Sequence, residues 1–137
     1  MYLLYCLGTM RKSSPDLERL FRALADTTRL RLLNLMRGRE ICVCYLVQVL
    51  NVSQPNISRH LAYLRRAGVV SPRREGKWMH YRLAPPSNQH AARILETTLD
   101  SLSRDPHMKR DLQKLNSACC GADSLVQVIG APLPSRV

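Results

Sequence analysis

The sequence predicts a mainly α-helical domain with a small β-hairpin, an α+β fold with the element order α-α-α-α-β-β-α. Three observations predict this fold: apolar residues recur at helical spacing over the first half of the chain, two strand-like runs follow around a glycine turn, and helical spacing returns after Pro85-Pro86. With 137 residues and a hydrophobic fraction of 45%, the chain can bury an ordinary core without disulfides or metals. We therefore expect a folded domain and exclude a disordered protein.

Two helices are expected at the start of this domain. The first, Asp16–Ala25, has one apolar face with the spacing i, i+3, i+4, i+7, formed by Leu17, Leu20, Phe21 and Leu24. Asp26 is suited to cap the second helix, Thr27–Arg37, and Gly38 is suited to end it. Apolar residues lie nearly all round this second helix, which predicts that it is buried.

A helix-turn-helix is expected next. A short third helix runs over Val43–Leu50, and Asn51-Val52-Ser53 form a tight turn. Ser53 can cap a fourth helix, and Pro55 is tolerated in its first turn. Gly68 ends this helix. Its apolar face is formed by Ile57, Leu61 and Leu64.

The predicted hairpin consists of the strands Val69–Arg74 and Trp78–Leu83, joined by Glu75-Gly76-Lys77, with basic residues at its tip. The next helix, Ser87–Ser103, carries an apolar stripe of the kind that a dimer interface needs. A further short helix starts at Asp105-Pro106.

The positive charge is concentrated in one stretch. A net charge of +11 arises from 21 Lys and Arg against 10 Asp and Glu, and Ser53–Arg82 holds seven basic residues with one acid, Glu75. Such an excess favours a polyanion, of which nucleic acid is the commonest. An anionic membrane surface would attract the same charge, but no apolar run approaches the roughly 18 residues of a membrane span.

The fourth helix carries the chemistry of DNA reading. In a helix-turn-helix, the second helix lies in the major groove with its N-terminal residues nearest the bases. Arg bonds guanine and Gln or Asn bonds adenine, while hydroxyls and His60 can bond phosphates. The hairpin tip would lie along a neighbouring backbone or minor groove. The predicted DNA-binding residues are Ser53, Gln54, Asn56, Ser58, Arg59, His60, Arg73, Arg74 and Lys77.

Over about Asp16–Ser103 the chain resembles the ArsR/SmtB family of winged helix-turn-helix metalloregulatory repressors, in particular the arsenic-responsive ArsR type. The similarity lies in LFRALADTTRLRLLNLM, ICVCYLVQVLNVSQPNISRHLAYLRRAGVV and REGKWMHYRL. The resemblance implies a homodimer, joined through the first and last helices of the domain, on a palindromic double-stranded operator. Because the sequence shows no export signal, we expect this dimer in the cytoplasm. It also implies that the free protein represses and that a bound ligand releases it from DNA.

The chain is expected to have three parts. Residues 1–9 are interpreted as an N-terminal extension, so that Met10 competes with Met1 as the start, and they lack the basic residue that opens a secretory signal. Residues 10–105 form the DNA-binding and dimerisation domain. Residues 106–137 form a short helix and, from Ser117, a mobile tail that carries two cysteines.

Five cysteines without an export signal are typical of reduced thiols rather than of a disulfide framework. The resemblance assigns inducer binding to Cys42-Val43-Cys44, and soft thiolates select soft ions. Residues i and i+2 point about 200° apart in a regular helix, so either Cys42 precedes the first turn or binding distorts that turn. Val47 stands where some relatives have a third cysteine. Cys119 or Cys120 is therefore the expected third ligand, with Cys6 as the runner-up.

The expected inducer is trivalent arsenic, As(III), with Sb(III), an organoarsenical, Cd or Pb as alternatives on the same thiols, and no constitutive cofactor. A redox switch on these cysteines is a further alternative. Some family members bind zinc on the last helix, but Asn88-Gln89-His90 lacks the needed ligands. We find no phosphate loop, paired acids or activated nucleophile, and therefore expect no enzyme.

Overall fold

Helices α2 and α3 form the centre of the fold in the computed structural model, which describes residues 16–120 and 124–137. The elements are a helix over 16–24, α2 (Thr27–Met36), β1 (Arg39–Cys42), α3 (Val43–Leu50), α4 (Gln54–Arg66), β2 (Val70–Glu75), β3 (Trp78–Leu83), α5 (Gln89–Leu102), α6 (Pro106–Cys120), α7 (Leu125–Ile129) and β4 (Ser135–Arg136). None of the helices in these ranges is long and apolar enough to cross a membrane.

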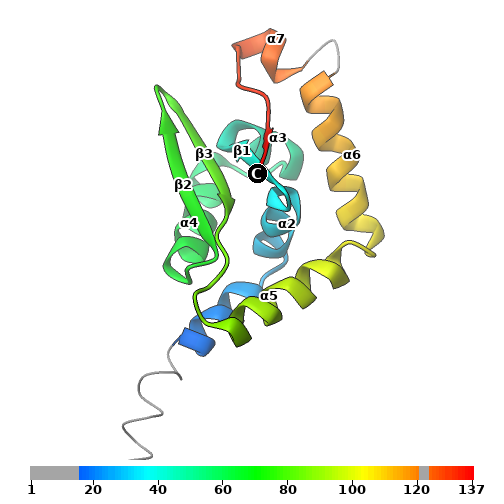
Figure 1. Cartoon of the computed structure of the whole chain (residues 1–137). Helices are drawn as coiled ribbons and strands as arrows, with labels where there is room; N and C mark the ends of the chain where they lie inside the picture. Colours follow the sequence, from blue (N-terminus) through cyan, green and yellow to red (C-terminus); the bar gives the residue numbers. More distant parts are fainter. Residues whose placement is uncertain (1–15, 121–123) are drawn as a thin grey trace, which may run out of the picture.

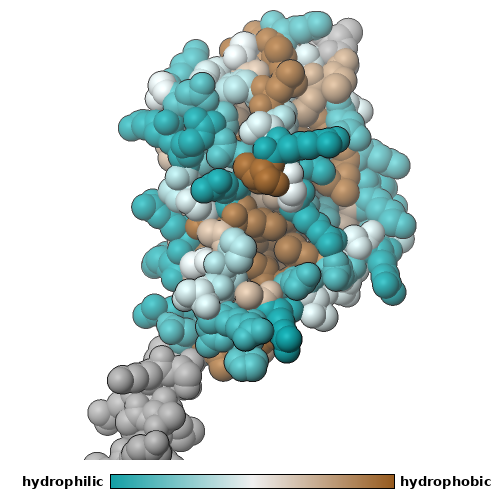
Figure 2. Space-filling model, in the orientation of Figure 1, coloured by the Kyte–Doolittle hydropathy of each residue, from teal (hydrophilic) through white to brown (hydrophobic). Residues whose placement is uncertain are grey.

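The elements surround this centre on several sides. The β2–β3 hairpin lies on one side and α6 on the other, while α5 runs across below them beside the first described helix (Figure 1). Apolar residues gather along the middle of this face, between the hairpin and α6 (Figure 2). The predicted mainly helical fold with a β-hairpin is confirmed.

The predicted burial of the second helix is confirmed, because α2 is covered on most of its circumference. Leu32, Leu33, Leu35 and Met36 are fully buried. Asp26 caps α2 as predicted, with its side chain accepting a hydrogen bond from the Arg29 amide at 3.0 Å. Ser53 occupies the N-cap position of α4, but its side chain makes no capping hydrogen bond. Helix α5 begins two residues later than predicted, because Asn88 caps it through the amides of His90 and Ala91.

The sheet is larger than the predicted hairpin. Its antiparallel strands have the order β2-β3-β1-β4, and Ile41 and Cys42 of β1 pair with Tyr81 and His80 of β3. Strand β1 was not predicted, because four residues are too few to show an alternating pattern. The hairpin turn is shorter than predicted and consists of two residues, of which Gly76 has the left-handed φ of +58° that such turns require.

The C-terminal part differs from the predicted short helix and mobile tail. Helix α6 has 15 residues and extends through Cys120, α7 follows, and β4 pairs with β1. These elements depend on contacts that are distant in sequence. Within this segment, Ala131 is buried, and its carbonyl accepts a hydrogen bond from the Tyr45 hydroxyl at 3.5 Å.

Helix α6 is attached to α2 by polar contacts in an otherwise apolar interface. Arg31 donates two hydrogen bonds to Asp111, at 2.7 and 2.9 Å, and the Asp111 side chain is only 4% exposed. The Asn34 side chain donates to the Met108 carbonyl at 3.1 Å. Because a buried charge is costly without its partner, this ion pair fixes where α6 lies.

We expect Arg31→Ala to lower the free energy of unfolding by about 3 kcal/mol, because it leaves the buried Asp111 carboxylate unpaired. This is the lower end for a broken buried ion pair, since the Arg31 side chain is 25% exposed. Urea denaturation followed by circular dichroism measures this change. Glu18→Ala is the matched control, because it removes an exposed ion pair with Arg22 and should cost less than about 0.5 kcal/mol. Equal losses in both variants would show that the buried pair does not hold α6.

Candidate nucleic-acid interface and thiol site

Helix α4 presents a polar face to solvent and an apolar face to the core. Its apolar residues Ile57, Leu61 and Leu64 are fully buried, which fixes the helix on the domain. The opposite face is therefore held towards solvent. The residues predicted to read DNA that are exposed there are Ser53, Gln54, Asn56, Ser58 and Arg59.

His60 lies differently from the other predicted DNA-binding residues of α4. Its Nδ1 atom is 3.4 Å from a guanidinium nitrogen of Arg29 and 3.8 Å from the Asp26 carboxylate. Arg29 also donates to the carbonyls of Arg22 and Ala23, at 2.7 and 2.9 Å. His60 therefore belongs to a polar network that joins α4 to the start of α2.

Arg29 is a basic residue at this surface that the sequence reasoning missed. Its guanidinium lies over the Tyr63 ring, 4.3 Å from the centroid. It lines a small hollow of about 160 Å³ together with Asn56, Arg59 and His60. The sequence gave no sign that Arg29 lies beside α4, because its place in the first turn of α2 is far from α4 along the chain.

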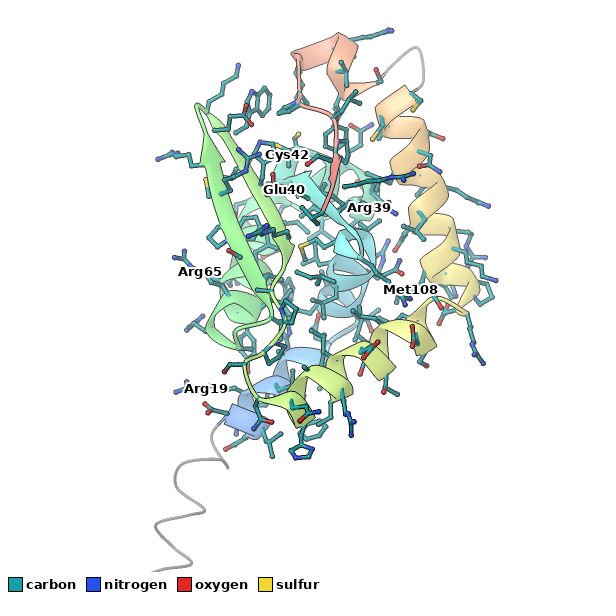
Figure 3. All side chains as sticks on the ribbon, in the orientation of Figure 1. Arg19, Arg39, Glu40, Cys42, Arg65 and Met108 are labelled. Atoms are coloured by element: carbon teal, nitrogen blue, oxygen red, sulfur yellow. The ribbon has the colours of Figure 1, made fainter. Side chains whose placement is uncertain are left out.

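The basic residues of the hairpin fall into two groups. Arg74 and Lys77 are exposed, and the Lys77 ammonium lies 4.9 Å from the centroid of the Trp78 ring. Arg73 instead donates to the buried Glu40 carboxylate, at 2.9 and 2.5 Å, and this pairing lowers the pKa of Glu40. Figure 3 shows Glu40 directed from β1 towards the hairpin. Arg73 thus holds the hairpin against β1.

Cys42 and Cys44 come together where β1 meets α3. Cys42 has extended backbone angles, φ −67° and ψ 143°, and is the N-cap residue of α3, whereas Cys44 lies within the first turn. Their sulfur atoms are 3.2 Å apart, with the Cys44 thiol donating to Cys42. Cys42 therefore precedes the first turn, which is the first of the two arrangements expected for this spacing.

The surroundings of Cys42 stabilise a thiolate. The hydrogen bond from the Cys44 thiol lowers the pKa of Cys42 to about 6, and backbone amides of Cys44, Met79 and Val43 add to this effect against the opposing effect of burial. Two of these amides belong to the start of α3, where the helix dipole also favours negative charge. The same hydrogen bond, followed by burial, raises the pKa of Cys44. The two sulfurs thus share one proton, which stays on Cys44 and leaves Cys42 as the thiolate.

A cavity of about 520 Å³ lies beside the two thiols. It is bounded by α3, the start of α4, the hairpin and α7. Its lining residues are Cys42, Val43, Cys44, Val47, Gln48, Gln54, Ser58, Lys77, Trp78, Met79, Tyr81, Leu125 and Ile129.

Cys119 and Cys120 lie at the end of α6 and do not join this pair. They line a different cavity, of about 330 Å³, together with Arg39 and Arg136. Among residues 16–120 and 124–137, no three His, Cys, Asp or Glu side chains gather closely enough to hold a metal ion. Burial raises the pKa of the half-buried Cys119. Cys6, the alternative third ligand, lies outside the described residues.

A buried supporting helix, an exposed polar helix after a tight turn, and an adjacent hairpin define a winged helix-turn-helix protein. Solved structures agree. HlyU from Vibrio cholerae N16961 is 30% identical and has a TM-score of 0.59, with 69% of this chain and 100% of that chain covered. The repressor BigR from Xylella fastidiosa is 29% identical with a TM-score of 0.53, with 69% and 93% covered.

Sequence comparison identifies the family. Residues 26–71 match the model of the bacterial regulatory protein, arsR family. The arsenical resistance operon repressor of Escherichia coli K12 is 50% identical over 78 residues, which are 56% of this chain and 67% of that protein. The arsenic resistance regulators ArsR1 and ArsR2 of Pseudomonas putida KT2440 are 48% and 44% identical, over 59% and 66% of this chain and 64% and 76% of their own lengths.

The chain therefore belongs to the arsR family of bacterial regulatory proteins, and the predicted resemblance is confirmed. This family consists of transcriptional regulators, which agrees with the expectation of no enzyme. The chain spans about two thirds of the length of the relatives that it matches.

The low pKa of Cys42 gives a measurable pH dependence. Because only the thiolate is nucleophilic, and its fraction rises as the pH passes the pKa, alkylation of Cys42 by iodoacetamide should rise around pH 6 and level off above it. Mass spectrometry of the modified peptide measures this rate. In Cys44→Ala, the loss of the thiol donor should move the rise to higher pH. An unchanged profile in this variant would contradict the shared proton.

Proposed function

We propose that the protein is a DNA-binding transcriptional repressor that leaves its operator when Cys42 and Cys44 bind trivalent arsenic, supplied as arsenite. The observation that carries this proposal is the pair of sulfurs 3.2 Å apart at the start of α3. Two soft ligands at this spacing fit a thiophilic ion, and antimonite shares that chemistry. The relatives named for arsenic resistance support the assignment. The free thiols of the described cysteines support a cytoplasmic location, because cysteines stay reduced there.

The DNA-binding part of the proposal rests on the exposed face of α4. Its N-terminal residues would enter the major groove of a palindromic operator, while Arg74 and Lys77 would lie on the adjacent backbone. A homodimer places two such helices about one helical turn of DNA apart. The helix over 16–24 and α5 are the proposed dimer interface, and Phe21 on the former exposes 54% of its surface.

Inorganic arsenic binds a third ligand, which we assign to Cys119 or Cys120 of the partner subunit. Within one chain these cysteines line a different cavity from Cys42 and Cys44.

The position of the thiols supports a link between arsenic binding and release of DNA, because Cys42 and Cys44 lie at the start of α3, the helix that packs against α4. A shift of α3 would change the spacing of the two α4 helices in the dimer.

A redox switch is the second candidate, because the same short sulfur separation and the low pKa of Cys42 favour oxidation of this pair. Peroxide without any metalloid would then release DNA, and dithiothreitol would restore binding. Release by arsenite under reducing conditions, with no release by peroxide, favours the metalloid-responsive repressor.

Cys42→Ser should abolish the response to arsenite while leaving DNA affinity within about twofold of the wild type, because Cys42 lies outside the exposed face of α4. Fluorescence anisotropy of a labelled operator, selected from random duplexes by the purified protein, measures both quantities. Cys120→Ser tests the third ligand in the same assay. Release of Cys42→Ser at the wild-type arsenite concentration would show that the site is wrong.

Arg59→Ala should weaken operator binding by about 1–3 kcal/mol, because Arg59 is exposed on the predicted reading face of α4 and can bond guanine bidentately. Lys109→Ala is the control, since Lys109 is exposed on α6, on the opposite side of the domain from the hairpin. If both variants bind the operator as the wild type does, α4 is not the reading helix.

A further inference from the structure

The thiol pair offers two sulfur ligands, whereas trivalent arsenic forms three bonds. Within the described residues no third thiol, imidazole or carboxylate gathers with Cys42 and Cys44. An arsenic atom held by both sulfurs of one chain therefore has a third bond left. The proposed partner thiol fills this bond for inorganic arsenic, whereas an organic arsenical brings its own substituent. The chemistry of that group is indicated by what surrounds the sulfurs.

The surroundings are an apolar and aromatic cavity. Both cysteines line it, and its volume of about 520 Å³ exceeds the roughly 150 Å³ that holds benzene in an apolar protein cavity. The sulfurs lie between α3 and the hairpin, and Leu125 and Ile129 of α7 form part of the wall. The apolar side chains of the wall include Val47, Trp78, Met79, Tyr81, Leu125 and Ile129.

We propose that this cavity holds the organic substituent of a mono-substituted trivalent arsenical, with room for an aryl group, while Cys42 and Cys44 hold its arsenic. The proposal rests on the proposed role of these thiols in arsenic binding. In the binding step an arsonous acid, R–As(OH)₂, exchanges both As–O bonds for As–S bonds. The Cys44 proton and one proton from solvent leave with the two hydroxyl groups as two water molecules, and arsenic remains trivalent.

The same cavity connects the ligand to DNA binding. Gln54 and Ser58 of α4 and Lys77 of the hairpin turn also line it, and all three are exposed on the surface proposed to face DNA. An organic group in the cavity therefore lies against the reading helix and the hairpin together. Inorganic arsenite has no group to fill this space, so an aryl arsenical should release DNA at a lower concentration.

Trp78 provides the readout, because it is the only tryptophan of the chain and lines the cavity. We would titrate the full chain, with Cys6, Cys119 and Cys120 replaced by serine, with phenylarsonous acid and methylarsonous acid. Both ligands use two thiols and differ only in the substituent. Dithiothreitol is a small dithiol without a cavity. The ratio of its affinities for the phenyl and methyl compounds therefore gives the intrinsic preference of two thiols for phenyl. For the protein, the ratio of phenyl to methyl affinity should exceed this reference ratio by about tenfold or more, because the cavity removes the apolar ring from water.

A pair of variants on α7 locates the effect. Leu125→Gln makes the cavity wall polar and should lower the phenyl preference towards the dithiothreitol value while leaving methylarsonous acid binding unchanged. Val128→Gln on the same helix is the control, since Val128 is 64% exposed and does not line the cavity. Circular dichroism verifies that both variants fold.

The outcomes separate this proposal from the one on which it rests. A phenyl preference equal to that of dithiothreitol, or an equal loss in both α7 variants, overturns the cavity proposal. If the wild-type chain still releases DNA with arsenite in that case, the proposed repressor function stands. Failure of the wild-type chain to bind arsenite or either organic arsenical overturns both.

Discussion

The change from extended to helical backbone at Cys42 is the constraint on which the thiol site depends. In a regular helix the two cysteines would point apart, but Cys42 belongs to β1 and only Cys44 belongs to α3. The sulfurs therefore converge, and the first amides of α3 are free to stabilise the Cys42 thiolate. Because Cys42 is also the register partner of His80, the same residue joins the sheet to the helix that supports α4.

The exposure of the polar face of α4 and the position of Cys42 and Cys44 result from one packing arrangement. The apolar faces of α3 and α4 meet in a common core, so the polar face of α4 points away from it. The cavity beside the thiols lies where α3, α4 and the hairpin diverge. Arg73 and Glu40 hold the hairpin at this point, and Arg29 holds α4 at its other side. The parts proposed to contact DNA are thus attached to the parts that surround the proposed ligand site.

The helices from residue 16 to 66 could be predicted because each has a continuous apolar face and clear ends, and the Cys-Val-Cys pair was evident in the sequence. The rest depends on partners distant in the chain. Four residues of β1 show no period, and α7 and β4 form only against the core. Arg73 looked like a free hairpin cation because nothing in the sequence pairs it with Glu40, 33 residues earlier. The separation of Cys119 and Cys120 from the other thiols follows from the length of α6.

Strand β4 has a consequence for self-association. Ser135 and Arg136 pair with Glu40 and Arg39 and so cover the outer side of β1 with a strand of two residues. An uncovered strand edge is a template on which a second chain can add, which leads to aggregation. The short β4, with a charged arginine, leaves little edge for such growth. The C-terminal segment therefore contributes to colloidal stability, because β4 covers the edge of β1 that β3 leaves open.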